Sequence, residues 1–162
     1  MCLPLLVLVF FVQLASANSE QDEQLFSQFI ELDNLLFEES FNKCRVEVLP
    51  PLIMEDFEFY HDVGGVQNRT EFLKAIKDNI CSNPNKKPMR KLVSGSMEIF
   101  SLKNNGILYG VVQRGIHEFY IKETGKKIYK NGIAKFTHLW ILDDGKWKLK
   151  RVLSFDHQPA SD

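Results

Sequence analysis

The residues best placed to do chemistry lie in the last predicted hairpin, between Gly132 and His157. Its turn is Asp144-Gly145, a pair that supplies the positive φ angles of a type I′ turn, so Asp143 is expected to pair with Lys146. The other face of the hairpin carries the lysines of both strands, so we expect the aromatic face to be buried. In this register the buried face holds Phe136, His138, Trp140, Leu142, Trp147, Leu149, Arg151, Leu153, Phe155 and His157.

The same register places His138 opposite Arg151 on the buried face. Ionisable groups among aromatic side chains need each other, another polar partner or a ligand. An arginine keeps its proton, so Arg151 must be neutralised by a carboxylate, contacted by other acceptors or left for an anionic ligand. This pair is therefore the first candidate for a functional site.

Two more turns extend the predicted sheet. Asn105-Gly106 is expected to form a second type I′ turn that pairs Asn104 with Ile107, and Thr124-Gly125 is a third candidate turn. If the three registers continue, Val111 lies beside Phe100 and His138. Gln113 then lies beside Glu98 and Phe136. His117 has the same parity, although a bulge at Gly110 or Gly115 would exchange the faces beyond it. The buried face then gathers Glu98, Gln113, His138 and Arg151.

The first half of the chain predicts two helices and one strand. Apolar residues at helical spacing indicate a long amphipathic helix over 23–43, and Pro50-Pro51 ends helical structure. The aromatic, alternating segment 56–62 predicts a strand in which His61 shares a face with Phe57 and Phe59. Thr70 is the expected N-cap of a second helix over 71–80.

This order of elements, with helices first and a meander of long strands last, predicts an α+β cone. The chain resembles the nuclear transport factor 2-like superfamily, in particular its SnoaL-like and uncharacterised small-domain branch. The resemblance is carried by Phe57-Glu58-Phe59-Tyr60-His61-Asp62-x-Gly64-Gly65, Arg69-x-x-Phe72-Leu73, Phe136-Thr137-His138-Leu139-Trp140 and Asp144-Gly145-x-Trp147-Lys148-Leu149. It implies a strongly curved, mixed or antiparallel sheet with the N-terminal helices packed on its concave face.

The resemblance also implies a pocket between sheet and helices, and a homodimer through the outer sheet face, where Leu139, Ile141 and Val152 are expected. Relatives include isomerases, dehydratases, cyclases and non-catalytic binding or assembly domains, so the fold does not decide between them. An isomerase-like reaction would use Glu98 or Asp62 as the base. A dehydratase-like reaction would use His138 as the base and Arg151 as the electrostatic stabiliser.

The expected function is an exported domain that binds a small polar or anionic molecule, with or without turnover. The alternative is a homodimeric interaction module whose buried polar residues are purely structural. The candidate pocket residues are His61, Glu98, Gln113, His117, His138, Trp140, Arg151 and His157.

Several other classes of function are disfavoured. No two of the four histidines have helix spacing or a His-x-His pattern, so we expect no metal site. The sequence has no serine-nucleophile motif, phosphate loop or dinucleotide fingerprint, so we expect no cofactor. Residues 18–85 hold 14 acidic and 5 basic residues, and residues 86–162 hold 7 and 15. Because the basic residues are spread along the strands, we expect the two halves to pack together and no nucleic-acid partner.

The N-terminus indicates export. Residues 1–17 are uncharged, apolar from Leu3 to Val12, and end in Ala15-Ser16-Ala17, the pattern of a signal peptide. We therefore expect a single domain over 18–162, secreted or periplasmic, with no membrane association after cleavage.

Removal of the leader leaves two cysteines, Cys44 and Cys81. In an oxidising compartment they are expected to form a disulfide, the alternative being two buried thiols. Asn68-Arg69-Thr70 is a glycosylation sequon in a eukaryotic secretory pathway, unless Thr70 serves only as a helix cap.

Overall fold

The computed structural model describes residues 20–160. The chain divides into two compact units, Met1–Leu32 and Asp33–Asp162, and the described part of the first unit is helical throughout. The predicted signal peptide and its cleavage point lie outside the described residues. Within those residues, none of the helices has both the length and the apolar character needed to cross a bilayer.

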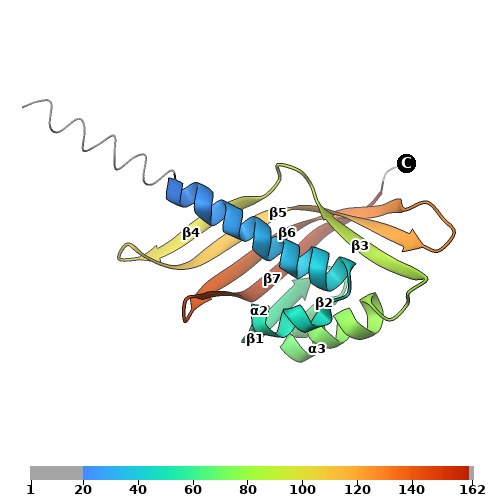
Figure 1. Ribbon diagram of the computed structural model, residues 1–162, viewed down its shortest axis with the longest axis horizontal. Helices are drawn as coiled ribbons and strands as arrows, with labels where there is room; N and C mark the ends of the chain where they lie inside the picture. The colour runs from blue at the N-terminus through green and yellow to red at the C-terminus, as the bar shows by residue number, and fades with distance from the viewer. Residues whose placement is uncertain (1–19, 161–162) are drawn as a thin grey trace, which may run out of the picture. The chain divides into compact units, whose positions relative to one another are not determined.

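The second unit contains the helices and strands labelled in Figure 1. Its helical segments include two π-helices, so the predicted helices over 23–43 and 71–80 each finish in π-helical geometry. In chain order the elements are η1 (Asn34–Asn42), η2 (Val46–Val48), α2 (Leu49–Leu52), β1 (Ile53–His61), β2 (Gly65–Asn68), α3 (Arg69–Ala75), η3 (Ile76–Ile80), β3 (Lys86–Leu92), β4 (Glu98–Asn104), β5 (Ile107–Glu123), β6 (Tyr129–Asp143) and β7 (Lys146–Pro159).

The N-cap of α3 differs from the sequence prediction. Asn68, and not Thr70, caps the helix: the Asn68 side chain accepts from the Glu71 backbone N–H at 3.0 Å. The Glu71 carboxylate accepts from the Asn68 backbone N–H at 2.9 Å, which completes a capping box. The sequon asparagine is thus exposed at the start of α3.

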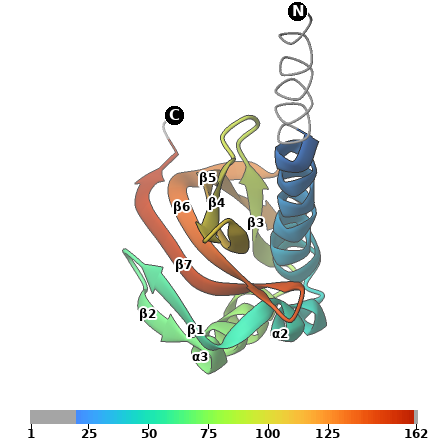
Figure 2. The same ribbon diagram turned by 90° about the vertical axis from the view of Figure 1, so that its left-hand side faces the viewer.

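The strands form one open, mixed sheet of seven strands in the order β2-β1-β7-β6-β5-β3, with β4 also paired to β5. Strands β1 and β7 are parallel, and the other pairs are antiparallel. Figure 2 shows the strong curvature of β6 and β7, with β1 beside β7. The predicted α+β class with a curved mixed sheet is confirmed.

The register of the last hairpin is as predicted only near its turn. Asp143 pairs with Lys146, and the two turn residues have the expected positive φ angles. The register then shifts between Trp140, which pairs with Leu149, and Leu139, which pairs with Arg151. The extra residue, Lys150, forms a β-bulge, and a single inserted residue exchanges the faces of the strand beyond it.

The bulge overturns the predicted pairing of His138 with Arg151, since His138 lies opposite Val152. Val152 and Ser154 are buried, whereas Leu153 and Phe155 are exposed. A second register shift, between Ile133 and Lys135 on the partner strand, returns His157 to the inner face. Each shift adds one residue to β7, so the register is displaced by two residues in total and the original facing is restored at the end of the strand.

A third register shift changes the predicted place of Glu98. Asn104 pairs with Ile107 as predicted, but the register shifts after Lys103, which pairs with Leu108. Glu98 consequently lies opposite Arg114 on the exposed face, and Gln113 lies opposite His138 on the buried one.

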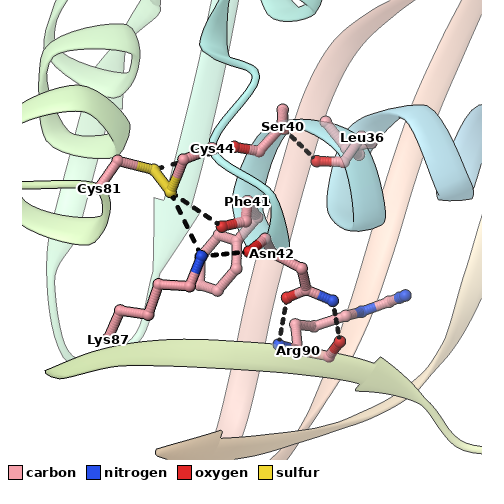
Figure 3. Close-up of a disulfide and its surroundings, with 8 residues drawn as sticks. All are labelled: Leu36, Ser40, Phe41, Asn42, Cys44, Cys81, Lys87 and Arg90. Atoms are coloured by element: carbon pink, nitrogen blue, oxygen red, sulfur yellow. Dashed lines mark hydrogen bonds between the residues drawn. A yellow bond between two sulfur atoms is a disulfide. The ribbon is translucent and has the colours of Figure 1, made fainter. Parts of the chain in front are cut away.

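Cys44 and Cys81 form a disulfide that links the end of η1 to the end of η3 (Figure 3). Beside it, the Asn42 side chain donates to the Arg90 carbonyl and accepts from the Arg90 N–H, each at 2.8 Å. Lys87 donates to the Asn42 carbonyl oxygen. These contacts tie η1 to both η3 and β3, and so fix the position of the helical residues around the site.

Candidate functional site

A cavity of about 600 Å³ lies between the inner face of the sheet and the segments η1, α3 and η3. Among the described residues that line it there is no lysine, arginine, aspartate or glutamate. All four histidines line it, namely His61, His117, His138 and His157. Its apolar lining includes Leu36, Phe37, Phe41, Phe59, Phe72, Ile76, Ile80, Phe119, Ile121, Ile133, Leu149 and Val152. The cavity is thus apolar over most of its surface, and its polar side chains are the four imidazoles together with neutral amides and hydroxyls, namely Ser40, Gln67, Asn79, Asn131, Ser154 and Gln158.

A buried ion pair lies behind these histidines. The Arg90 guanidinium donates to both carboxylate oxygens of Asp33, at 2.6 and 2.9 Å, and it also stacks 3.8 Å from the centre of the Phe37 ring. Burial raises the pKa of Asp33, and the Arg90 charge acts in the opposite direction. The third arginine nitrogen, Nε, donates to His117 Nδ1 at 3.5 Å. The position of the arginine therefore fixes the tautomer of His117.

The proton positions on His117 and in the groups beyond it follow from the Arg90 Nε–H donor. Because His117 Nδ1 accepts, its proton is on Nε2, which donates to the Ser154 hydroxyl at 3.4 Å. The hydroxyl can then donate to His157 Nε2, also at 3.4 Å, and His157 Nδ1–H donates to Asp62 at 2.5 Å. The result is one directed chain of hydrogen bonds from Arg90 to Asp62. Burial and the nearby Arg90 charge lower the pKa of His117 to about 3, so His117 is neutral in this chain.

The chain ends at the partly exposed side of the cavity, where Asp62 holds His157 in place. Asp62 accepts from both the imidazole and the backbone N–H of His157. Burial pushes the pKa of Asp62 upward, but these hydrogen bonds outweigh it, so the pKa lies below its ordinary value. His61 stacks on His157 with 4.3 Å between ring centroids, and burial followed by the proximity of His157 lowers the pKa of His61.

One potential metal-ligand atom from each of His61, Asp62 and His157 lies within 4.8 Å of the other two, a spacing that could hold a metal ion. The two rings are inclined by only 19°, so their in-plane lone pairs do not converge on one point. His61 Nδ1 also accepts from the Val63 and Gly64 backbone N–H groups, at 3.1 and 3.0 Å. The geometry is that of a hydrogen-bonded cluster.

His138 is the most buried of the four histidines. It is fully buried, and its Nδ1 lies 3.1 Å from the side-chain oxygen of Gln113, which also accepts from the Trp140 indole N–H at 2.8 Å. Burial, with smaller contributions from Arg90 and His117, places the pKa of His138 well below its ordinary value. His138 is therefore a neutral hydrogen-bonding group.

The structure brings together most of the predicted site residues. The four histidines line the cavity, Asp62 contacts His157, and Gln113 and Trp140 lie behind His138.

Arg151 and Glu98 do not belong to the site. Arg151 lies on the outer face, where its Nε donates to Glu58 at 2.9 Å and its Nη1 donates to the Asp56 carbonyl. Glu98 pairs with Arg114 at 2.8 Å, and both side chains are 54% exposed. Two bulges are the physical reason. The bulge at Lys150 moves Arg151 to the opposite face from the one predicted, and the bulge near Lys103 does the same for Glu98.

Sequence reasoning missed three residues of the site: Asp33, Arg90 and Ser154. Asp33 precedes Leu36, Phe37 and Ser40 at the spacing of one helix face, a signal that could have identified it as buried. Ser154 faces inward only because of the bulge in β7.

Comparison with known proteins shows similarity at the level of structure. No family model matches the sequence, and no curated protein matches it. ActVI-ORFA from Streptomyces coelicolor is 10% identical with a TM-score of 0.67, covering 83% of this chain and 98% of that one. A nuclear transport factor 2-like superfamily protein from Salmonella enterica is 13% identical with a TM-score of 0.64, covering 86% and 94%.

LinA is 18% identical with a TM-score of 0.58, covering 92% of both chains. A putative calcium/calmodulin-dependent protein kinase II association domain from Xanthomonas campestris is also similar, at 16% identity and a TM-score of 0.58, covering 81% of this chain and 84% of that one. At these identities the similarity concerns the fold alone.

Proposed function

Because the chain has the nuclear transport factor 2-like fold, we propose that it binds a small, neutral and largely apolar molecule in the cavity between sheet and helices. The similarity to these structures is consistent with a small domain that binds a ligand or catalyses a reaction. One observation carries the proposal: a cavity of about 600 Å³ whose surface is mostly apolar and whose polar lining residues are all uncharged amides, hydroxyls and imidazoles. Ligand sites in proteins commonly have this size and composition.

The sequence predicts a polar or an anionic ligand, and the charges around the cavity favour a neutral ligand over an anionic one. Arg151, the predicted partner of an anion, lies on the outer face, and Arg90 is already neutralised by Asp33. An anion in the cavity would lose its hydration without gaining a cation, which is unfavourable. A neutral molecule has no such cost.

An acid–base enzyme is the second candidate, favoured by the contact between Asp62 and His157. The carboxylate fixes the His157 proton on Nδ1, so Nε2 has its lone pair directed to the hydroxyl of Ser154, another residue of the cavity lining. In such a pair the imidazole takes a proton from the substrate and the carboxylate stabilises the resulting imidazolium. His157 therefore replaces His138 as our candidate base, because the low pKa of His138 makes that imidazole a poor proton acceptor.

Export and dimerisation remain proposals with separate support. The Cys44–Cys81 disulfide fits a protein of an oxidising compartment. A dimer through the outer sheet face is supported by the exposure of Tyr60, Leu153 and Phe155. Val152, expected on that face, lines the cavity instead.

Calorimetric titration with 2-naphthol and its anionic analogue 2-naphthoate tests the binding proposal. We expect 2-naphthol to bind and 2-naphthoate to bind at least tenfold more weakly. Val152→Phe, which adds a ring to the cavity, should abolish binding. Leu153→Phe, at the next residue but on the outer face, should not. Equal binding by the two variants, or tighter binding of the anion, would contradict the proposal.

A further inference from the structure

The hydrogen-bond pattern around His138 begins with a group whose role is fixed. The indole N–H of Trp140 can only donate, and it points at the side-chain oxygen of Gln113 at 2.8 Å. The amide of Gln113 therefore cannot be reversed, because its NH₂ group would then face another donor. The Gln113 nitrogen is directed instead to the Met97 sulfur, at 3.2 Å.

This orientation determines the tautomer of His138. The Gln113 oxygen has no hydrogen to donate, so the contact with His138 Nδ1 at 3.1 Å requires a proton on Nδ1. The low pKa of His138 means that the ring carries one proton and no more. His138 Nε2 is consequently a bare acceptor.

His138 Nε2 has no hydrogen-bond partner within the described part of the chain, although the atom is buried. The ring packs against Phe37 and Phe136, at centroid distances of 6.0 and 4.5 Å, and the whole residue is buried. His138 is also one of the residues that line the cavity. Buried acceptors are nearly always satisfied in folded proteins, and a donor on a molecule in the adjoining cavity would satisfy this one.

We propose that His138 Nε2 accepts a hydrogen bond from a hydroxyl or N–H group of the molecule that the cavity binds. This inference rests on the proposed binding function and narrows its ligand class. The ligand is a neutral, mainly apolar molecule with a donor at its buried end, such as a phenol, an enol or an alcohol. A water molecule can fill the same role in the empty cavity, and the ligand donor then displaces it.

A matched pair of probes tests this directly: 2-naphthol, which has a donor, and 2-methylnaphthalene, which has a methyl group of similar size in its place. We expect 2-naphthol to bind at least tenfold more tightly to the full protein. A hydroxyl is harder to dehydrate than a methyl group, so this preference requires a partner in the cavity. In His138→Phe the preference should be lost or reversed. In Thr137→Val, the adjacent residue on the outer face, it should be retained.

The outcomes separate this inference from the proposed function. Equal binding of both probes to the wild type, or a hydroxyl preference that survives in His138→Phe, overturns the role of His138 and leaves the binding function intact. No binding of either probe overturns both. If His138→Phe does not fold, ¹⁵N NMR of the wild-type imidazole decides, because we expect the proton on Nδ1 and an unprotonated Nε2. A proton on Nε2 overturns the inference.

Discussion

The buried Asp33–Arg90 pair provides the sharpest test of the interior. Both side chains are almost inaccessible, at 9% and 2% exposure, and the pair has two direct hydrogen bonds. Removing one partner leaves the other charge buried without compensation, a change that costs about 3–5 kcal/mol. We therefore expect Asp33→Leu and Arg90→Met each to lower the free energy of unfolding by about this amount.

The double variant should behave differently, because it replaces both charges by apolar groups. We expect it to lose much less stability than the sum of the single variants, and the difference measures the coupling between the two side chains. Urea unfolding monitored by circular dichroism provides all four free energies. The exposed pair Glu98–Arg114 is the matched control, where the same substitutions should show little coupling. Strict additivity at Asp33 and Arg90, or equal coupling at both pairs, would refute this reasoning.

Three further outcomes are expected. His117 and His138 are neutral in the folded protein but titrate near pH 6.5 when it unfolds, so the unfolded state binds more protons in acid. Each histidine should therefore lower the free energy of unfolding by about 2 kcal/mol between pH 7 and pH 5. Urea titrations over this pH range should show the loss, and the loss should be smaller in His117→Gln. Because the Cys44–Cys81 bond closes a segment with a sequence separation of 37, its reduction should lower stability by about 4 kcal/mol. Two free thiols in unreduced, denatured protein that lacks residues 1–17, and with them Cys2, would contradict the bond. Asn68→Ala should cost about 1 kcal/mol through loss of the helix cap and Asn68→Asp much less, as measured by thermal unfolding at neutral pH.

Local signals in the sequence predicted the parts of the fold that depend on neighbouring residues. The turns at Asp144-Gly145 and Asn105-Gly106 have the expected pairings, because the conformations that these residues favour are set by their own chemistry. The bulge at Lys150 has no comparable signature, and a single inserted residue exchanged the faces beyond it. For this reason the sequence placed Arg151 inside and missed Ser154.

The candidate site could be predicted in part. All four histidines line the cavity, although His157 faces inward only because two register shifts in the last hairpin together displace β7 by two residues, which restores the facing. The buried arginine is Arg90, and its partner Asp33 is 57 residues away in the chain. A contact at that separation depends on how η1 packs on β3, which neither helical periodicity nor strand alternation specifies.

A crystal structure of the protein with 2-naphthol tests the central claim most directly, since it reports both where the molecule binds and how it is oriented. We predict the naphthalene ring inside the cavity among Phe37, Ile76 and Val152, with its hydroxyl oxygen within hydrogen-bonding distance of His138 Nε2. A probe bound on the outer sheet face, or one inside the cavity with its hydroxyl directed away from His138, would contradict this account.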